Sequence, residues 1–456
     1  MIEKSAEVVI CGAGIAGIAA AYYLTQAGVN NVILIDKQEP LSLTTAKSGE
    51  NYRNWWPNEP MAALCNRSIE LMEGLAAATN NSFLMNRSGY VYATMSRSSA
   101  EVVAQVERVY GALPVGEIRV HKHAGSYKGE VPQAADSHYN GADILTDPAL
   151  IRRTLPHLSD QVTAVVHARR GGSISVHQLG MYLLQAAKAA GVQAWRGELL
   201  EVESDGGAVS AVVVQVGEQR YRIQTDYFVN AAGPFMSHVA QMMGVALPVQ
   251  TVFQQKIAMQ DPLGVIPRTA PFTIFTDGQT LNWSAEERQQ LAEDAEFGWL
   301  LQRLPGGLHI KPEGRGDSQW LKLGWAINNE ATAPQWAPQG SDEFPDLVLR
   351  GASKLMPALS HYIGKIPTPL VHYGGYYTKT AENMPLIGPV SEIEGVYLLG
   401  ALSGFGTMSA CAAGELCATW LTNGRLPAYA WAFAPGRYQD AAYRTFLDTL
   451  ANDGEL

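Results

Sequence analysis

The chain has 456 residues, with 33 basic and 43 acidic side chains and a formal charge of −10. This length predicts two or three domains and leaves room to bury a large cofactor. The charges form no long single-sign blocks, which argues against nucleic acid or an anionic lipid surface as the main partner. The four cysteines have neither CxxC nor Cys/His ligand spacing, so the sequence predicts no disulfide framework and no metal site.

Two uncharged stretches, Val8 to Leu24 and Val396 to Gly414, approach the lower length limit of a membrane-spanning helix, but glycines interrupt both. Cleavage of the first stretch as a signal peptide would also destroy the glycine-rich motif described next. We therefore expect a cytoplasmic protein without a membrane span.

A glycine-rich turn follows the first predicted strand. The run 7–11 leads into Gly12-Ala13-Gly14-Ile15-Ala16-Gly17, and an alanine-rich helix through about Ala27 comes next. In such a motif the first glycine permits the tight turn, the second lets the backbone approach a pyrophosphate, and the third lets helix pack on strand. The phosphates would lie at the positive helix N-terminus, which begins with Ile15 and Ala16.

A second strand is expected over Val32 to Ile35, with Asp36 and Lys37 at its tip. The carboxylate of Asp36 is placed to accept hydrogen bonds from a ribose hydroxyl. An acidic residue at this position disfavours NADP, but the motif alone does not distinguish NAD from FAD.

Three later segments favour FAD. Residues 44–53 are polar, small and turn-rich where an NAD domain would continue its βαβ winding, and 226–233 is a buried strand that ends in small residues. The strand 395–400 runs into a second glycine turn and another alanine-rich helix, whose N-terminus would face an electron-rich group. The candidate cofactor-binding residues in these segments are Thr45, Ser48, Gly49, Glu50, Ala232, Gly233, Gly404, Phe405, Gly406, Thr407 and Met408.

Together these segments resemble the D-amino-acid oxidase and monomeric sarcosine oxidase family of flavoproteins. Two internal matches are sharper than the glycine turns: 320–325 (WLKLGW), and 377–380 (YTKT) followed by 385–388 (PLIG). The resemblance implies an α/β fold, with a Rossmann-like FAD domain of the glutathione reductase type and an inserted substrate domain with a mixed or antiparallel sheet. The expected segments are 1–90, 165–240 and 366–430 for FAD, 91–164 and 241–365 for substrate, and 431–456 as a tail or capping helix.

The resemblance also implies roles for individual side chains. Lys322 matches an oxygen-activating lysine and shares a strand face with Trp320 and Gly324. The alternative is a lysine without a catalytic role that extends out of a half-buried strand. Arg53 is a candidate for binding either the flavin or a substrate carboxylate, and Tyr377 is a further catalytic candidate.

The departures from the family concern substrate and cofactor attachment. Met408 replaces a carboxylate-binding lysine, Ala326 replaces a histidine, and Gly375 stands where a cysteine holds flavin covalently. No histidine precedes His121, so attachment through an N-terminal histidine is also absent, and we expect dissociable FAD. The aromatic residues that we expect either to line an enlarged substrate pocket or to form plain core are Trp55, Trp56, Trp325 and Tyr376.

The resulting hypothesis is an FAD-dependent oxidase that removes a hydride from the carbon next to an amine, giving an imine and, with oxygen, hydrogen peroxide. The amine is expected to be bulkier than glycine or sarcosine. The alternative is an FAD-dependent dehydrogenase of an amine or hydroxy compound that passes electrons to a quinone or carrier. A non-catalytic FAD module and an NAD-only dehydrogenase are further alternatives.

Overall fold

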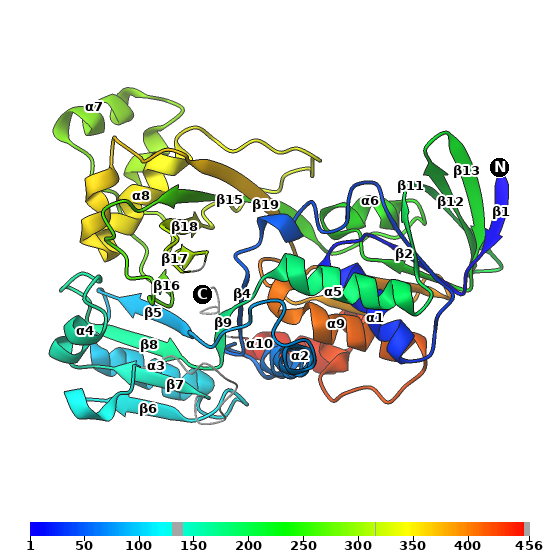
Figure 1. The fold of residues 1–456 in the computed structure, drawn as a ribbon, viewed down its shortest axis with the longest axis horizontal. Helices are drawn as coiled ribbons and strands as arrows, with labels where there is room; N and C mark the ends of the chain where they lie inside the picture. Colours follow the sequence, from blue (N-terminus) through cyan, green and yellow to red (C-terminus); the bar gives the residue numbers. More distant parts are fainter. Residues whose placement is uncertain (130–139, 315, 451–456) are drawn as a thin grey trace.

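The computed structural model describes residues 1–129, 140–314 and 316–450, and two large sheets lie toward opposite ends of its longest axis (Figure 1). The six-stranded sheet has the order β10 (Gln193–Arg196), β3 (Val32–Asp36), β2 (Val8–Cys11), β14 (Tyr227–Asn230), β21 (Val396–Gly400) and β20 (Leu386–Pro389). Its strands pair in parallel except β20, which runs antiparallel to β21. The short apolar runs predicted from the sequence are buried here, as strands covered on both faces require.

Three helices pack together beside this sheet. Helix α1 (Ile15–Gln26) contacts both α5 (Val176–Ala189) and α9 (Gly406–Leu421). A Cβ atom on Gly414 of α9 would lie 2.6 Å from the carbonyl carbon of Ala19, so only glycine permits this close approach to α1. Because α1 follows β2 and α9 follows β21, both helices begin at the same edge of the sheet, where such folds bind their ligands.

A four-stranded sheet supplies apolar residues to the other side of the six-stranded sheet. Its order is β1 (Ile2–Ser5), β13 (Gln219–Gln224), β12 (Ala208–Val216) and β11 (Glu198–Asp205). Val9 and Ile33 of the larger sheet share a core cluster with Val212 and Ile223. This packing fixes the strands that carry the first glycine turn.

The second large sheet has nine strands. Their order is β19 (Val371–Lys379), β15 (Gln250–Gln260), β18 (Trp320–Trp325), β17 (Leu308–Glu313), β16 (Phe272–Phe275), β5 (Tyr90–Thr94), β8 (Ala164–Ala168), β7 (Ala142–Leu145) and β6 (Ile118–His121). Strands β15 to β18 form the antiparallel sheet expected within residues 241–365, and α8 (Phe344–Leu355) contacts β17 and β18. Strands β8 and β19 also belong here, so the predicted FAD segments 165–240 and 366–430 each begin with a strand of the other sheet.

Several smaller elements complete the fold. Strands β4 (Asn51–Arg53) and β9 (Gly171–Ser173) pair beside α2 (Glu59–Ala78), while α3 (Ser99–Tyr110), α4 (Pro148–Thr154) and α6 (Met236–Gln241) connect strands. Helix α7 (Ala285–Glu293) has no buried residue, as expected for the polar helix near 284–294. No helix of the described residues has the length and apolar character needed to cross a membrane.

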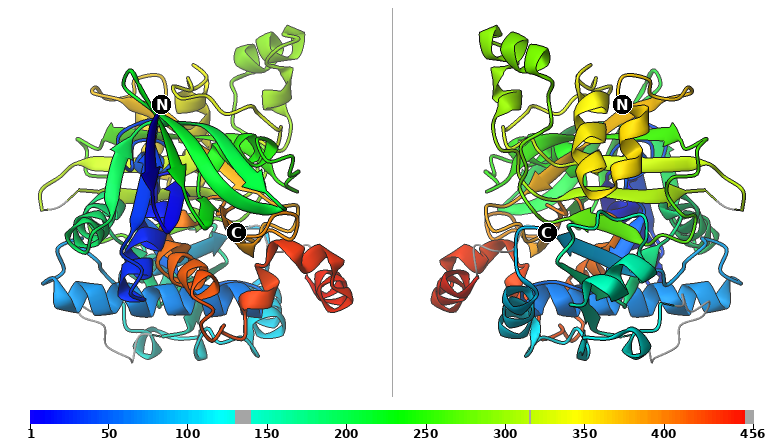
Figure 2. Two further views of the ribbon diagram at one scale, coloured as in Figure 1. Left: turned by 90° about the vertical axis from the view of Figure 1, so that its right-hand side faces the viewer. Right: turned by 90° about the vertical axis from the view of Figure 1, so that its left-hand side faces the viewer.

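The last described residues form α10 (Ala441–Thr449), at the periphery of the molecule (Figure 2). Buried Arg437 donates a hydrogen bond of 2.6 Å to Glu382, which lies in the loop after β19. The same Glu382 oxygen accepts hydrogen bonds from Tyr438 (2.8 Å) and Tyr443 (2.7 Å). The C-terminal helix is therefore anchored to the loop between β19 and β20.

Candidate cofactor and active site

A cavity of about 760 Å³ is lined by residues of both large sheets. One part lies along the carboxyl ends of β2, β3, β14 and β21, where Asp36, Ala232 and Gly400 contribute. Another part lies against β15, β17 and β19, where Lys256, His309 and Tyr377 contribute. The cavity thus joins the expected cofactor region to the expected substrate region.

The first glycine turn is held tightly at the end of β2. Gly12 has a φ of +112°, and a Cβ atom there would lie 2.2 Å from the carbonyl oxygen of Ala231. The carboxylate of Asp36 accepts hydrogen bonds from the backbone N–H groups of Ala13 (2.7 Å) and Gln38 (2.8 Å). Burial raises the pKa of Asp36, while these two N–H groups oppose that rise. A carboxylate has lone pairs to spare for a ribose hydroxyl after these bonds are made.

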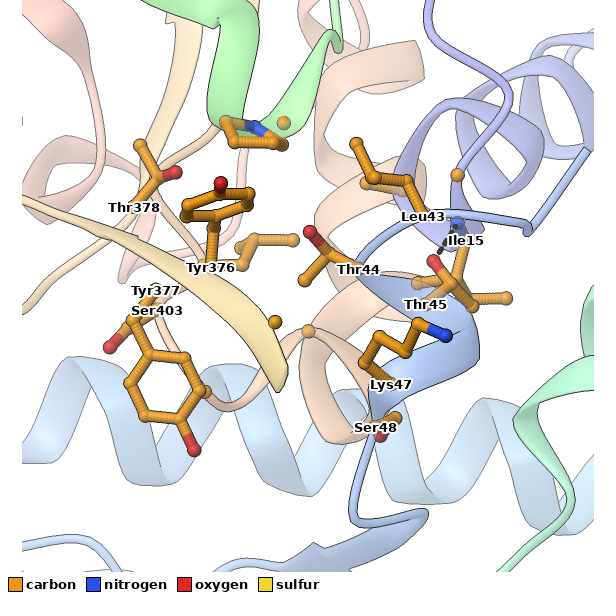
Figure 3. A pocket seen from close by; sticks show the side chains of 18 of the residues that line it. Ile15, Leu43, Thr44, Thr45, Lys47, Ser48, Tyr376, Tyr377, Thr378 and Ser403 are labelled. Atoms are coloured by element: carbon orange, nitrogen blue, oxygen red, sulfur yellow. Dashed lines mark hydrogen bonds between the residues drawn. The ribbon is translucent and has the colours of Figure 1, made fainter. Parts of the chain in front are cut away.

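Two helix N-termini meet at the cavity, joined by the loop that contains Thr45 and Ser48. Thr45 Oγ1 accepts a hydrogen bond of 3.1 Å from Ile15 N at the start of α1, and Ser48 Oγ lies 2.6 Å from Thr407 Oγ1 in the first turn of α9. Figure 3 shows this loop between Ile15 and the strand that carries Tyr376 to Thr378. Neither N-cap residue, Gly14 or Phe405, supplies a side-chain hydrogen bond. Thr45 accepts from Ile15 N, and the next N–H groups of α1, like the first ones of α9, can face an anionic ligand.

The turn before α9 has an unusual backbone. Ala401 and Ser403 have φ values of +54° and +43°, in the left-handed region that non-glycine residues seldom adopt. Ser403 N donates a hydrogen bond of 2.9 Å to Thr378 O, and a Cβ atom on Gly404 would lie 2.5 Å from Tyr377 Cζ. The second glycine turn is therefore pressed against β19, and backbone strain of this kind concentrates at ligand-binding sites.

Arg53 brings a buried positive charge to the cavity wall. Its side chain is only 7% exposed, and its guanidinium carbon lies 4.9 Å, 5.1 Å and 5.8 Å from the ring centroids of Trp56, Tyr90 and Tyr92. Its Nε donates a hydrogen bond of 3.2 Å to Trp55 O. Burial works against the charge, but Tyr92 and Tyr90 outweigh that effect and raise the pKa of Arg53. Arg53 is therefore charged at any working pH.

Three lysines occupy one face of the nine-stranded sheet. The register pairs Lys256 with Gly324, and it pairs Lys322 with both Ala258 and Lys311. Lys322 Nζ lies 2.8 Å from Glu313 Oε2 and 3.9 Å from Glu50 Oε2, and Lys311 Nζ lies 3.4 Å from the same Glu313 oxygen. Burial lowers the pKa of Lys322, but Tyr373 and Glu313 together raise it above the ordinary value.

Most residues predicted from the sequence line the cavity. They are Gly12, Gly14, Ile15, Ala16, Asp36, Lys37, Thr45, Ser48, Gly49, Glu50, Arg53, Trp56, Ala232, Gly233, Gly375, Tyr376, Tyr377, Gly404, Phe405, Gly406, Thr407 and Met408. Gly17 lies behind the wall, where a Cβ atom would come within 1.9 Å of Gly12 O, so its part is the packing of helix on strand. Lys322 does not line the cavity either. Its Nζ donates a hydrogen bond of 3.5 Å to Ser48 O, in the cavity loop that contains Thr45 and Ser48.

Of the four aromatic residues expected either to line the pocket or to form core, Trp55 and Trp325 form core. Trp55 stacks on Tyr110 with ring centroids 4.0 Å apart, and Trp325 donates a hydrogen bond of 3.0 Å from Nε1 to Pro305 O within the core under α8. Both side chains are at most 2% exposed and neither lines the cavity, so they belong to the packed interior. Tyr90 and Phe272 supply aromatic surface at the cavity instead.

Sequence reasoning missed Lys256 of β15 and His309 of β17, which line the cavity. Neither lies in a recognisable motif, and both reach the site only through the long-range pairing of β15, β18 and β17. Their alternation with apolar neighbours could have placed them on one strand face, but not beside a particular partner strand. Among the described residues, no group of three or more His, Cys, Asp or Glu side chains is arranged to hold a metal ion.

These features define a dinucleotide-binding protein whose cavity extends to a second sheet. A family model described as FAD dependent oxidoreductase matches residues 7–420, and the chain belongs to this family. FAD is therefore its cofactor. The helix starts at Ile15 and Gly406, the glycine turn against Ala231 and the acid at Asp36 fit such a ligand.

Individual proteins resemble the chain at low sequence identity. Mitochondrial dimethylglycine dehydrogenase of Rattus norvegicus is 21% identical over 96% of this chain, which spans only 45% of the length of that relative. The solved structure of L-proline dehydrogenase from P. horikoshii has a TM-score of 0.72 at 20% identity, covering 96% of this chain and 99% of that one. L-α-glycerophosphate oxidase from Mycoplasma pneumoniae, solved with FAD bound, has a TM-score of 0.68 at 14% identity, covering 93% and 96%.

Proposed function

We propose that the protein oxidises the bond between a carbon and the nitrogen of a carboxylate-bearing amine, and passes the electrons to oxygen. The observation that carries the proposal is the buried guanidinium of Arg53 at the cavity wall, surrounded by aromatic rings. A cation that is itself buried attracts a carboxylate strongly and can bind it through paired hydrogen bonds. The names of the dimethylglycine and L-proline dehydrogenases support an amine that also bears a carboxylate.

Different residues along the cavity would bind the cofactor and the substrate. The starts of α1 and α9 and the loop with Thr45 and Ser48 would hold FAD, which supplies a hydride acceptor when bound. Arg53 would orient the substrate by its carboxylate, and Tyr377, packed on Gly404, would limit where the amine can lie. Amine oxidation by hydride loss demands mainly positioning, which agrees with a wall of aromatic and cationic side chains.

We propose a substrate bulkier than glycine or sarcosine and a dissociable FAD. Trp56, Tyr376, Tyr90 and Phe272 give the cavity a broad aromatic surface that favours a larger N-substituent or side chain. Gly375 has no side chain for attachment, and a Cβ atom there would lie 3.0 Å from Lys47 Cβ.

We propose Lys322 as the residue that promotes the reaction of reduced enzyme with oxygen. Its pKa is raised, so its ammonium group keeps its charge, and it is tied to the cavity loop at Ser48 O and Glu50. A fixed cation at this depth would stabilise the developing charge of superoxide.

Oxygen uptake by the purified holoenzyme tests this proposal. The panel pairs each amino acid or N-alkyl amino acid with the same amine lacking its carboxylate, and adds α-hydroxy acids and α-glycerophosphate. We expect uptake with peroxide formation only for amines, and a preference for the carboxylated member of each pair. Arg53→Met should remove that preference, a loss of about 10- to 150-fold if a charged hydrogen bond contributes about 1.5–3 kcal/mol.

Two results would overturn the assignment. Turnover of hydroxy compounds alone would favour the hydroxy-compound dehydrogenase. Equal slowing of both members of each pair by Arg53→Met would exclude carboxylate binding by that side chain. Arg67→Met serves as a matched control, because Arg67 forms its ion pair with Glu415 and does not line the cavity.

A further inference from the structure

Lys256 differs from its two lysine neighbours in where its nitrogen lies. It lines the cavity, whereas Lys311 and Lys322 do not. Its Nζ donates a hydrogen bond of 3.1 Å to Lys47 O and lies 5.9 Å from the ring centroid of Tyr377. Gly324 leaves room for this position, since a Cβ atom there would lie 2.9 Å from Lys256 Cγ.

On this face of the sheet, the other two lysines form the ion pairs. Glu313 lies within 2.8 Å of Lys322 and 3.4 Å of Lys311, and Glu50 lies 3.9 Å from Lys322. Among the described residues, no carboxylate lies within ion-pair distance of Lys256. Its side chain is nevertheless only 6% exposed, so water does little to stabilise a charge there.

Burial and the neighbouring cations favour loss of the proton from Lys256. Burial lowers the pKa of Lys256 to about 8, and the positive charges of Lys322 on β18 and Lys311 on β17 add to this effect. The remaining titratable groups that face it are neutral: burial lowers the pKa of His309 to about 3, and it raises the pKa of Tyr373 and Tyr377 on β19. Lys47 contributes its backbone carbonyl.

We propose that Lys256 is the proton acceptor for the substrate ammonium group in the cavity. This inference rests on the proposed amine oxidation. An amine enters as a cation, whose nitrogen has no lone pair. An N–H bond of the substrate breaks, the proton forms a new bond to Nζ of neutral Lys256, and the electron pair stays on the substrate nitrogen. That pair forms the C=N bond while the α-hydrogen leaves as a hydride with its two electrons to the bound cofactor.

A neutral lysine fits the geometry of this step. Its amine donates one hydrogen to Lys47 O, which orients the side chain, and its lone pair remains free to accept a proton. An acceptor whose pKa lies near the working pH is also the most effective proton carrier. Lys322, whose pKa is raised and whose charge is balanced by Glu313, suits the opposite role of a permanent cation.

The test is the pH dependence of two measurements on the holoenzyme. Anaerobic flavin reduction by the fastest amine of the panel should accelerate as the pH rises through about 8, because Lys256 must be neutral. Lys256→Gln should lose this pH step and slow reduction about 10²- to 10⁴-fold. Lys256→Arg, which keeps a charge but cannot accept a proton, should be equally slow.

The second measurement is binding of trimethylammonioacetate, which has a carboxylate but no removable N–H proton, followed by the flavin spectrum. We expect its affinity to change less than about twofold in Lys256→Gln. Two results together would overturn the proposal: an affinity of the wild type for trimethylammonioacetate that falls as the pH rises through about 8, and an active Lys256→Arg variant. They would show that Lys256 binds the carboxylate.

Lys311→Met is the matched variant for the electrostatic argument. Lys311 is equally buried but does not line the cavity, and its charge lowers the pKa of Lys256. In Lys311→Met, flavin reduction should still accelerate with rising pH, but the midpoint of that acceleration should move to a higher pH. If Lys256 has a purely structural role, the midpoint should not change. If no amine reduces the wild type, the proposed function itself fails; if amines reduce it and Lys256→Gln matches it, only the role of Lys256 fails.

Discussion

Substitution of Gly12 by alanine tests the claim that the first glycine turn shapes the cofactor site. Alanine at φ +112° is strained, and its Cβ atom would also lie 2.2 Å from Ala231 O. Gly28 is the matched control, because it has a φ of +90° but no heavy atom within 4 Å of a Cβ atom. The left-handed backbone costs about 1–2 kcal/mol at either position. The overlap with Ala231 adds about 1–3 kcal/mol at Gly12 alone.

The assay combines urea unfolding of the apoprotein with FAD titration by flavin fluorescence. We expect Gly28→Ala to lower the free energy of unfolding by about 1–2 kcal/mol and to leave FAD affinity within about twofold. Gly12→Ala should lose about 2–5 kcal/mol and bind FAD at least about tenfold more weakly, because the turn must move away from β14. Equal behaviour of the two variants in both measurements would refute the reasoning.

Three further predictions follow from the same geometry. Acid precipitation should release FAD into the supernatant, and a yellow pellet would contradict the inference from Gly375. Lys322→Met should slow reoxidation by oxygen about 10²- to 10³-fold in stopped-flow measurements while sparing anaerobic reduction, and equal slowing of both steps would remove its proposed role. Burial raises the pKa of Glu382, but the charge of Arg437 and the hydrogen bond from Tyr443 help to hold that pKa below its usual 4.5. The stability advantage of wild type over Glu382→Gln in thermal unfolding should therefore be full above about pH 4.5 and shrink as the pH falls; a constant difference would exclude this ionisation.

The cofactor half of the site could be predicted from the sequence because its determinants are local. The turn from Gly12 to Gly17 follows β2 directly, and Asp36 ends the next strand, so spacing along the chain places them together. The same holds for the turn between β21 and α9. Parallel pairing of neighbouring strands then brings both turns to one sheet edge.

The substrate half could not be predicted as well, because its geometry depends on pairing between distant strands. Lys256 approaches Lys322 only through the register of β15 with β18, and a shift of one residue would turn it to the other face. The positions of Trp55 and Trp325 could not be predicted from the sequence either. Each is followed in the sequence by a residue that lines the cavity, Trp56 or Ala326. The strand and loop geometry nevertheless directs both rings into the core.

Anaerobic reduction of the bound flavin tests the central claim most directly. The holoenzyme is mixed without oxygen with amino acids, N-alkyl amino acids, larger amines and hydroxy acids, and the flavin absorption band near about 450 nm is followed before and after air is admitted. We predict bleaching by carboxylate-bearing amines and rapid recovery in air. Bleaching by hydroxy acids alone, or a reduced flavin that air does not reoxidise, would contradict an amine oxidase.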